Sequence, residues 1–566
     1  MSELRAVLLV GVVGMAVVLP AQSQKAGRRP LAPADVDAIT ELVMLEDRRQ
    51  FDEAVLTKLL KSAHPEVRRR AVVATGRIVD PAGKALLAAA RKDDDVDIVA
   101  TVAFATGQLK DPDAVAWLSE LLMAAGTPPA VGREAAQALG KIRTPAARMA
   151  LAQYLTSAPQ SAAAAPVVGE ALLAIGRFTT RDDLAPALKW TTAGDVEVRW
   201  RAAWALFRPR DPAAVSRLFE LSLDPSAEVR FWALRGLAPA LVIEAGVDLA
   251  KAAGRLRDAV RDPDRRVRAE ALRVLVQYDD DASFGVVLEA LESPDSWLSV
   301  SAAESLGRFK ARADAVVPRL VAATAPARPT SLRMSAMAPL AALAPEAAAD
   351  AAATLVRSSS VAARALATQV LQKLGELGRA RLDALAADPA AKGLIASPGN
   401  GPGPRPVPPK RSEADYRLIV ERWIVPDYHG AAKPRAVLAT PRGEIELELY
   451  AGDAPIGLDY LVRVIESGAI VGTEFGRVVP NFVAQQRPIR DAMTLRDEVS
   501  RRGLTRGNLS WASAGLDTGR PGYTLGITPQ PHNEGDFTAL GGVVRGMEAV
   551  DRLELGDAIT AARLLR

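Results

Sequence analysis

The sequence predicts a multidomain chain in which an all-α solenoid precedes a compact domain rich in β-strands. A helical pattern repeats every 31 to 38 residues through most of residues 35–395. A stretch rich in proline and glycine interrupts this pattern at 396–413, and hydrophobic residues then begin to alternate with charged ones. Because the chain has 566 residues, its length also favours several domains over one.

The composition favours closely packed helices and excludes several functional classes. Hydrophobic residues make up 49% of the chain and aromatic residues only 5%, which is typical of helices packed through alanine, leucine and valine. The net charge of +4 is small and the basic residues are interleaved with acids, so we expect no nucleic-acid partner. The absence of cysteine excludes thiol chemistry. The three histidines, His64, His429 and His532, lie far apart, so we expect no metal centre and no cofactor.

The N-terminus has the pattern of a secretory signal. Arg5 precedes an apolar run from Ala6 to Leu19, and small residues follow, so cleavage is expected near Ser23. The run is shorter than the roughly 20 residues that a membrane-spanning helix needs. We therefore expect residues 1–23 to be a signal peptide. The mature protein would be periplasmic or secreted, without an integral membrane segment. An uncleaved N-terminal anchor is the alternative.

The repeated unit in the first part of the chain is a pair of helices. In "VRRRAVVATG" and its copies, small residues follow an apolar anchor at offsets that share one helical face. The anchors are Val67, Ile98, Val131, Val167, Val198, Val229, Val267 and Leu298, with weaker copies from Leu332 and Val361. Five copies close with glycine, which suits a helix C-terminus. Second helices such as 114–125 and 213–223 lie between the anchors.

A period of this length built from paired helices predicts a solenoid. Residues 35–395 resemble the HEAT repeat family. The resemblance implies that an arginine following the anchor bonds an aspartate between successive repeats. The arginines in question are Arg68, Arg199, Arg230 and Arg268. It also implies a long concave surface for a protein partner.

Beyond the 396–413 linker, the pattern is that of a compact β-rich domain over 414–566. A short helix is expected at 413–425. Ile445, Leu447 and Leu449 then alternate with glutamates, which predicts a half-buried strand. The next segment, "APIGLDYLVRVIESG", has helical spacing and ends on glycine.

Several motifs in the C-terminal domain occur in a distinctive order. They are "GTEFGRVVPNF", "GNLSWASAGLDT" and "ITPQPHNEGDFTALGGVVRGMEAVDRL". Residues 436–555 therefore resemble the cyclophilin family of peptidyl-prolyl cis-trans isomerases. The resemblance implies a closed eight-stranded antiparallel β-barrel with two helices, a substrate groove on its outer face and no cofactor.

The resemblance also implies the site residues. Arg477 in "FGRVV" stands at the position of the catalytic arginine, and Gln485 at that of the glutamine that orients it. The implied substrate-binding residues are Phe482, Val483, Gln485, Ala512, His532 and Phe537. Some positions depart from the family. Val483 replaces a methionine, Phe537 a histidine and Asn533 a leucine, and a pocket phenylalanine falls at Gly526.

Such a site would accelerate rotation about an X–Pro amide bond. Resonance sets the barrier at about 18–20 kcal/mol. A cationic donor near the prolyl nitrogen takes its lone pair out of resonance and lowers that barrier. We therefore expect a peptidyl-prolyl isomerase acting on proline-containing protein or peptide clients, with the solenoid as a protein-binding platform. The alternative is a non-catalytic scaffold with a degenerate groove. A HEAT-repeat metalloenzyme is rejected because the repeats contain one histidine, His64.

Overall fold

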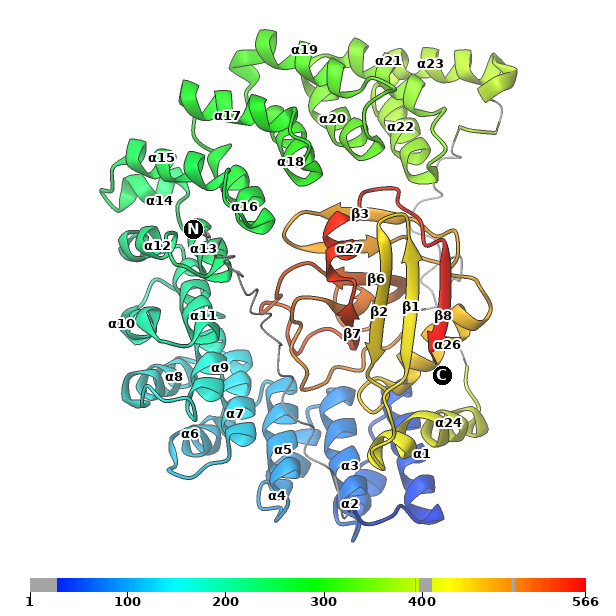
Figure 1. The fold of residues 1–566 in the computed structure, drawn as a ribbon. Coiled ribbons are helices and arrows are strands. Elements are labelled where there is room, and N and C mark those ends of the chain that lie inside the picture. The colour runs from blue at the N-terminus through cyan, green and yellow to red at the C-terminus, as the bar shows by residue number, and fades with distance from the viewer. Residues whose placement is uncertain (1–27, 392, 396–409, 490–493, 566) are drawn as a thin grey trace, which may run out of the picture.

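The computed structural model describes residues 28–391, 393–395, 410–489 and 494–565. The predicted signal peptide and residues 396–409 of the predicted linker lie outside these ranges. Figure 1 shows the helices of the first part following an arc, with the β-rich part inside the hollow of that arc. Among the described residues, no helix is both long and apolar enough to cross a bilayer.

The arc is built from paired helices. Its first half contains α1 Pro33–Arg48, α2 Glu53–Leu60, α3 Pro65–Ile78, α4 Gly83–Ala90, α5 Val96–Gln108, α6 Val115–Met123, α7 Pro129–Ile142, α8 Pro145–Ser157, α9 Ala165–Ile175, α10 Ala185–Leu188, α11 Val196–Phe207 and α12 Val215–Leu221. Its second half contains α13 Ala227–Leu234, α14 Pro239–Glu244, α15 Leu249–Ala259, α16 Arg265–Leu275, α17 Asp281–Leu291, α18 Ser296–Leu306, α19 Ala313–Ala323, α20 Thr330–Leu343, α21 Pro345–Leu355, α22 Val361–Lys373 and α23 Gly375–Ala387.

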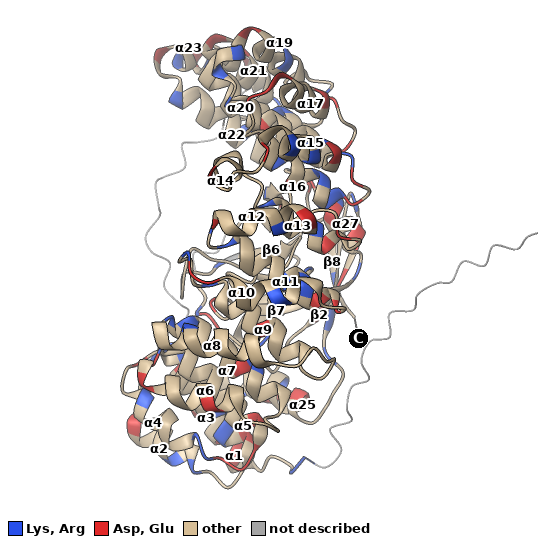
Figure 2. Ribbon diagram, turned by 90° about the vertical axis from the view of Figure 1, so that its left-hand side faces the viewer, with Lys and Arg blue, Asp and Glu red and all other residues tan. Residues whose placement is uncertain are grey.

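The helices that carry the repeated motif form one continuous row. Each packs on the next in the order α3, α5, α7, α9, α11, α13, α16, α18, α20 and α22. The eight strong anchor residues are all buried in this row, as expected for positions on one apolar helical face. Lys and Arg are interspersed with Asp and Glu along the solenoid, as Figure 2 shows. The HEAT-like architecture predicted from the repeat is thus present.

Three of the five closing glycines have a packing role that the sequence did not predict. Gly176 and Gly307 are the C-cap residues of α9 and α18, as predicted. Gly76, Gly107 and Gly140 lie in the last turn of α3, α5 and α7 but are not the C-cap residues. A Cβ atom at these positions would come within 2.7–2.8 Å of atoms of the next helix in the row. These three glycines are therefore close to a helix C-terminus, as predicted, but they serve helix packing and not capping. Glycine is used there because adjacent helices approach too closely for any side chain.

The predicted arginine ladder between repeats is confirmed. Arg199 Nε lies 3.0 Å from Asp224 and Arg230 Nη2 lies 2.8 Å from Asp262. The pairs at the other two predicted positions are Arg68 with Asp93 and Arg268 with Asp295. Each arginine also donates to a main-chain carbonyl six residues earlier. The ladder fixes one repeat on the next, so these arginines are structural.

The chain then returns to the start of the arc. Helices α24 Glu413–Ile419 and α25 Val425–Tyr428 are joined by a π-helical turn, Val420–Ile424. Helix α24 packs on α1 (Figure 1). The hydroxyl of Tyr416 donates to Asp47 over 2.7 Å, and Arg411 pairs with the same carboxylate at 2.8 Å. This returning segment covers the first repeat.

The remaining elements form an eight-stranded antiparallel sheet. They are β1 Arg435–Thr440, β2 Gly443–Leu449, α26 Pro455–Glu466, β3 Phe475–Val479, β4 Val483–Gln486, β5 Asn508–Ala512, β6 Arg520–Gly526, β7 Ala539–Arg545, α27 Met547–Arg552 and β8 Ala561–Leu565. The strand order is β3-β4-β6-β5-β7-β2-β1-β8. Main-chain hydrogen bonds between 472–475 and 556–559 bring the two edges of the sheet together. The sheet therefore curls into a barrel. Ile445, Leu447 and Leu449 face its core as predicted.

The barrel and the solenoid share a hydrophobic core. One buried cluster contains Ile39 and Leu42 of α1, Trp297 of α18, and Leu438 and Ile445 of the barrel. The concave face, which the sequence suggested would receive a protein partner, is therefore occupied by the protein's own barrel. An apolar interface of this kind couples the folding of the two parts.

Polar contacts extend this interface along most of the arc. They join Arg49 with Asp517, Arg77 with the carbonyls of Asp453, Glu498 and Val499, Arg501 with Asp97 and Glu134, Lys141 with the carbonyl of Gly535, Arg177 with those of Pro531 and Glu534, Arg265 with that of Asp551, Ser331 with Glu554, and Glu474 with the N–H groups of Val361 and Ala362. Residues in or directly after α1, α3, α5, α7, α9, α16, α20 and α22 thus hold the barrel.

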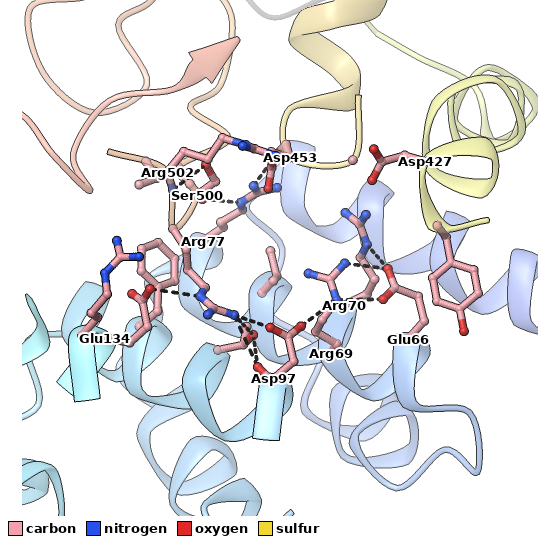
Figure 3. A pocket seen from close by; sticks show the side chains of 18 of the residues that line it. Glu66, Arg69, Arg70, Arg77, Asp97, Glu134, Asp427, Asp453, Ser500 and Arg502 are labelled. Atoms are coloured by element: carbon pink, nitrogen blue, oxygen red, sulfur yellow. Dashed lines mark hydrogen bonds and ion pairs between the residues drawn. The ribbon is translucent and has the colours of Figure 1, made fainter. Parts of the chain in front are cut away.

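A polar cavity of about 370 Å³ lies within this interface, between α3, α5, α7 and the barrel loops at 452–453 and 499–502 (Figure 3). Its arginines face carboxylates: Arg69 and Arg70 pair with Glu66, Arg501 with Asp97 and Glu134, and Arg502 with Asp453. Arg69 and Arg70 hold the pKa of the buried Glu66 carboxyl at about 2, against the effect of burial. The cavity is therefore lined by a network of ion pairs, and this network joins the solenoid to the barrel.

Candidate active site

Arg477 and Gln485 meet on the outer face of the barrel. They are opposite one another in the β3–β4 pair, and Arg477 Nη1 donates a 3.3 Å hydrogen bond to Gln485 Oε1. Arg477 is exposed although Phe475, two residues earlier in the same strand, is buried. Residues two apart in a regular strand point to the same face. A bulge between Phe475 and Arg477 breaks this rule and turns the arginine outward.

Phe482 forms an aromatic floor beside this arginine. The Arg477 guanidinium carbon lies 5.4 Å from the centre of the Phe482 ring. His532 stacks on the same ring, with centroids 5.9 Å apart and an interplanar angle of 27°. Val483 is buried and pairs with Val479 and with Gly526. The structure thus gathers Arg477, Phe482, Gln485 and His532 in one place.

Gly526 leaves no space for the ring that the family places there. A Cβ atom at this position would lie 2.1 Å from Asn508 Oδ1 and 3.3 Å from the Thr505 carbonyl oxygen. Asn508 is itself buried. The aromatic wall is therefore absent because the local packing of the barrel leaves no room for a side chain at position 526.

The other two predicted residues lie at the ends of strands. Ala512 is half-buried at the end of β5, opposite Arg520 of β6. Phe537 is half-buried and comes just before β7. Asn533, in the same loop as His532, donates to Gln530 Oε1 over 2.9 Å. The substrate-binding roles of all these residues stay predictions.

The solenoid positions the loop that carries His532. Arg177 Nη2 donates to the carbonyls of Pro531 and Glu534 at 2.9 and 3.0 Å, and Lys141 Nζ bonds the carbonyl of Gly535. On the other side of the site, the Asn481 side-chain amide donates to the carbonyl of Arg266 over 2.8 Å. Both rims of the groove are therefore fixed by helices of the repeats.

Phe482 and His532 open onto a cavity of about 490 Å³ between the barrel and the solenoid. The solenoid wall of this cavity contains Trp204, Phe207, Arg208, Arg210, Arg235, Ala238, Leu241, Glu270, Arg273, Val274 and Gln277. These residues were not among the site residues predicted from the sequence. A signal was present, because the copies "VRWRAAWALF" and "VRFWALRGLA" together carry five aromatic residues, whereas the other six copies carry one, Phe104.

The electrostatic potential in the cavity is positive. The His532 ring is exposed to the cavity but enclosed by its walls. This enclosure, together with the charges of Arg208, Arg235 and Arg177, lowers its pKa to about 4. The imidazole is therefore neutral at neutral pH. Within the part of the chain that the structure describes, no cluster of side chains could hold a metal ion. The chemistry available is that of a cationic donor beside an apolar surface.

A curled antiparallel barrel that presents an arginine, a glutamine and a phenylalanine on its outer face defines a cyclophilin-type peptidyl-prolyl isomerase domain. The family model described as "Cyclophilin type peptidyl-prolyl cis-trans isomerase/CLD" matches residues 436–565. A model for HEAT repeats matches residues 83–168, 162–238 and 254–338. The chain belongs to the cyclophilin-type isomerase family through its C-terminal domain, and its N-terminal part is a HEAT-repeat solenoid.

Individual relatives align with the barrel alone. A peptidyl-prolyl cis-trans isomerase of Helicobacter pylori is 32% identical over 134 residues, which is 22% of this chain and 82% of the relative. Peptidyl-prolyl cis-trans isomerase B of Bacillus subtilis is 32% identical over 129 residues, which is 21% of this chain and 90% of that relative. A solved cyclophilin type peptidyl-prolyl cis-trans isomerase of Cryptosporidium parvum is 17% identical, with a TM-score of 0.23, covering 24% of this chain and 98% of that one.

Proposed function

We propose that the protein catalyses cis–trans isomerisation of X–Pro bonds in exported protein clients, with Arg477 as the catalytic donor. The observation that carries this proposal is the grouping of Arg477, Gln485 and Phe482. Phe482 would bind the proline ring, and Gln485 would orient the Arg477 guanidinium. Gln485 accepts a hydrogen bond from the guanidinium and so limits its orientations. Phe482 offers an apolar surface within reach of the same cation.

The mechanism needs no covalent step. The proline ring lies on Phe482, and an N–H of Arg477 donates to the prolyl nitrogen as the amide twists. The twisted amide has a pyramidal nitrogen with a free lone pair, whereas the planar ground state has none to offer. The hydrogen bond therefore stabilises the transition state more than the substrate. Val483 and His532 complete the apolar surroundings, and Ala512 offers backbone groups to the extended client.

The solenoid is proposed to act as a platform by supplying the second wall of the client cavity. Trp204 and Phe207 give that wall an apolar part opposite Phe482. If the wall binds the client, Phe207→Ser raises KM for a protein client at unchanged kcat. An unchanged KM with a proline-limited refolding client would exclude the platform.

Export is proposed from the N-terminal pattern of Arg5 and the apolar run from Ala6 to Leu19. The proposal predicts that the protein isolated from its native cells lies outside the cytoplasm and begins near Gln24. N-terminal sequencing after cell fractionation tests it, and an intact Met1 on cytoplasmic protein would refute it.

A non-catalytic scaffold is the second candidate, and Gly526 favours it because the groove lacks one aromatic wall. The two functions are separated by an exchange assay with the full chain and peptides containing one X–Pro bond. Catalysis predicts faster cis–trans exchange at substoichiometric protein. Peptide binding without any increase in exchange would support the scaffold. The full chain is used because the barrel shares its core with the solenoid.

A further inference from the structure

The cavity beside Phe482 is large enough to receive more of a client than the proline itself. Its volume of about 490 Å³ falls in the range of about 300–1,000 Å³ that is usual for ligand sites. One wall comes from the groove, and the other comes from helices α11, α14 and α16 and from the turns that follow α11, α13 and α16. A client on Phe482 must therefore place neighbouring residues against the solenoid.

The charges in this cavity do not balance. Arg208, Arg210, Arg235 and Arg273 line it, and Glu270 is the carboxylate among its lining residues. Glu270 is fully buried and already bound, because Arg235 Nε lies 3.1 Å from it and Arg273 pairs with the same oxygen. Two positive charges, those of Arg208 and Arg210, therefore have no carboxylate partner among the described residues.

Arg208 is held close to the groove by aromatic packing. Its guanidinium carbon lies 5.5 Å from the centre of the Trp204 ring. Its Nε is buried and has no hydrogen-bond partner within the described part of the chain. Burial and the nearby positive charges of Arg143 and Arg177 lower its pKa. An unpaired cation in this position is costly, and an anionic group brought by a ligand would relieve that cost.

The field of these arginines reaches the groove itself. Arg208 and Arg235 both oppose protonation of His532, and the His532 ring stacks on Phe482. His532 thus lies between the two parts of the site, because it stacks on Phe482 and is affected by the charge of Arg208. Arg210 and Arg273 are exposed at the solvent side of the cavity, so an extended segment can enter past them.

We propose that this cavity is a recognition subsite for an Asp or Glu side chain close to the proline, with Arg208 as its specificity-determining residue. The substrate class would be acidic X–Pro segments of proteins. This inference rests on the proposed isomerase function. It adds a selectivity that comes from the solenoid and not from the barrel.

The test uses the full chain and matched peptides that carry Glu, Gln or Lys at one position within three residues of the proline. We expect kcat/KM for the best Glu peptide to exceed that for its Gln partner by about tenfold, the effect of one charge-assisted hydrogen bond. Lys peptides should be poorer still, and added salt should weaken the preference. Equal rates for all three peptides would overturn the inference while leaving the isomerase function intact.

The charge-reversal variant Arg208→Glu is expected to favour Lys over Glu peptides, a gain that misfolding cannot produce. Arg261→Ala is the matched control, because Arg261 is 63% exposed, pairs with Glu289 and lies outside the cavity. It should keep the wild-type preference. A preference for Glu that survives Arg208→Glu would refute the subsite. If no peptide is isomerised, the proposed function fails, and calorimetric binding of the same three peptides still tests the charge preference.

Discussion

Arg477 reaches Gln485 because a bulge at Gly476 turns it out of the barrel core, and the two side chains then join across the β3–β4 pair at 3.3 Å. The arginine would otherwise share the face of Phe475, which is buried. The local irregularity therefore creates the site. It places one cation on an otherwise apolar strand, over the Phe482 ring.

Arg477→Ala is expected to lower kcat/KM for X–Pro exchange by about 100- to 1,000-fold, the usual loss when one preorganised donor is removed. Arg477→Lys should recover little, since lysine cannot keep the planar geometry that faces both Gln485 and the substrate. NMR exchange spectroscopy on a proline peptide measures the effect. Arg463→Ala, an exposed change on α26, should leave the rate unchanged. Full activity in Arg477→Ala would remove the arginine from the mechanism.

Gly526→Ala is expected to destabilise the protein by about 1–3 kcal/mol, as overpacking usually does. The added Cβ would lie 2.1 Å from the buried Asn508 side chain. Gly285→Ala in α17 is the control, since nothing lies within 4 Å of its Cβ position. It should stabilise the helix by up to about 1 kcal/mol. Urea unfolding measures both. A free energy of unfolding for Gly526→Ala equal to that of the unchanged protein would show that position 526 can accept a side chain.

Arg77→Met is expected to lower the free energy of unfolding by about 3–5 kcal/mol, because it leaves a buried carboxylate unpaired. Arg77 pairs with Glu46 at 2.8 Å, with both side chains almost fully buried, and donates to the barrel carbonyls of Asp453 and Val499. The double variant with Glu46→Gln should lose less than the sum of the two single variants. Additive losses would show that the pair is not coupled.

Stability should fall as the pH rises from about 4.5 to about 7, because of Glu498. Burial raises the pKa of this carboxyl to about 7 in the folded protein. Between its ordinary value and 7 the native state keeps a proton that the unfolded chain has lost, so deprotonation favours unfolding. Glu498→Gln should remove this part of the pH dependence. Urea unfolding at pH 5 and pH 7.5 measures it, and an unchanged slope in the variant would contradict the assignment.

Much of the architecture could be predicted from local patterns. The anchor spacing from Val67 to Leu298 predicted the row of packed helices, and the arginines after four anchors predicted the ladder of Arg–Asp pairs. These features repeat within a few tens of residues, so each copy supports the others. The same periodicity did not reveal that Gly76, Gly107 and Gly140 pack against the next helix, because a helix-packing glycine and a capping glycine look alike in sequence.

The sequence by itself determined the two domain types and the set of candidate residues around Arg477, since both are written in short motifs whose residues are neighbours along the chain. Only the tertiary structure decided where the barrel sits and what faces its groove. Docking inside the arc depends on contacts such as Arg177 with Pro531 and Asn481 with Arg266, which join residues more than two hundred positions apart. No local pattern encodes such pairs. The wall that carries Arg208 became part of the site through shape and charge matching between two separately patterned surfaces.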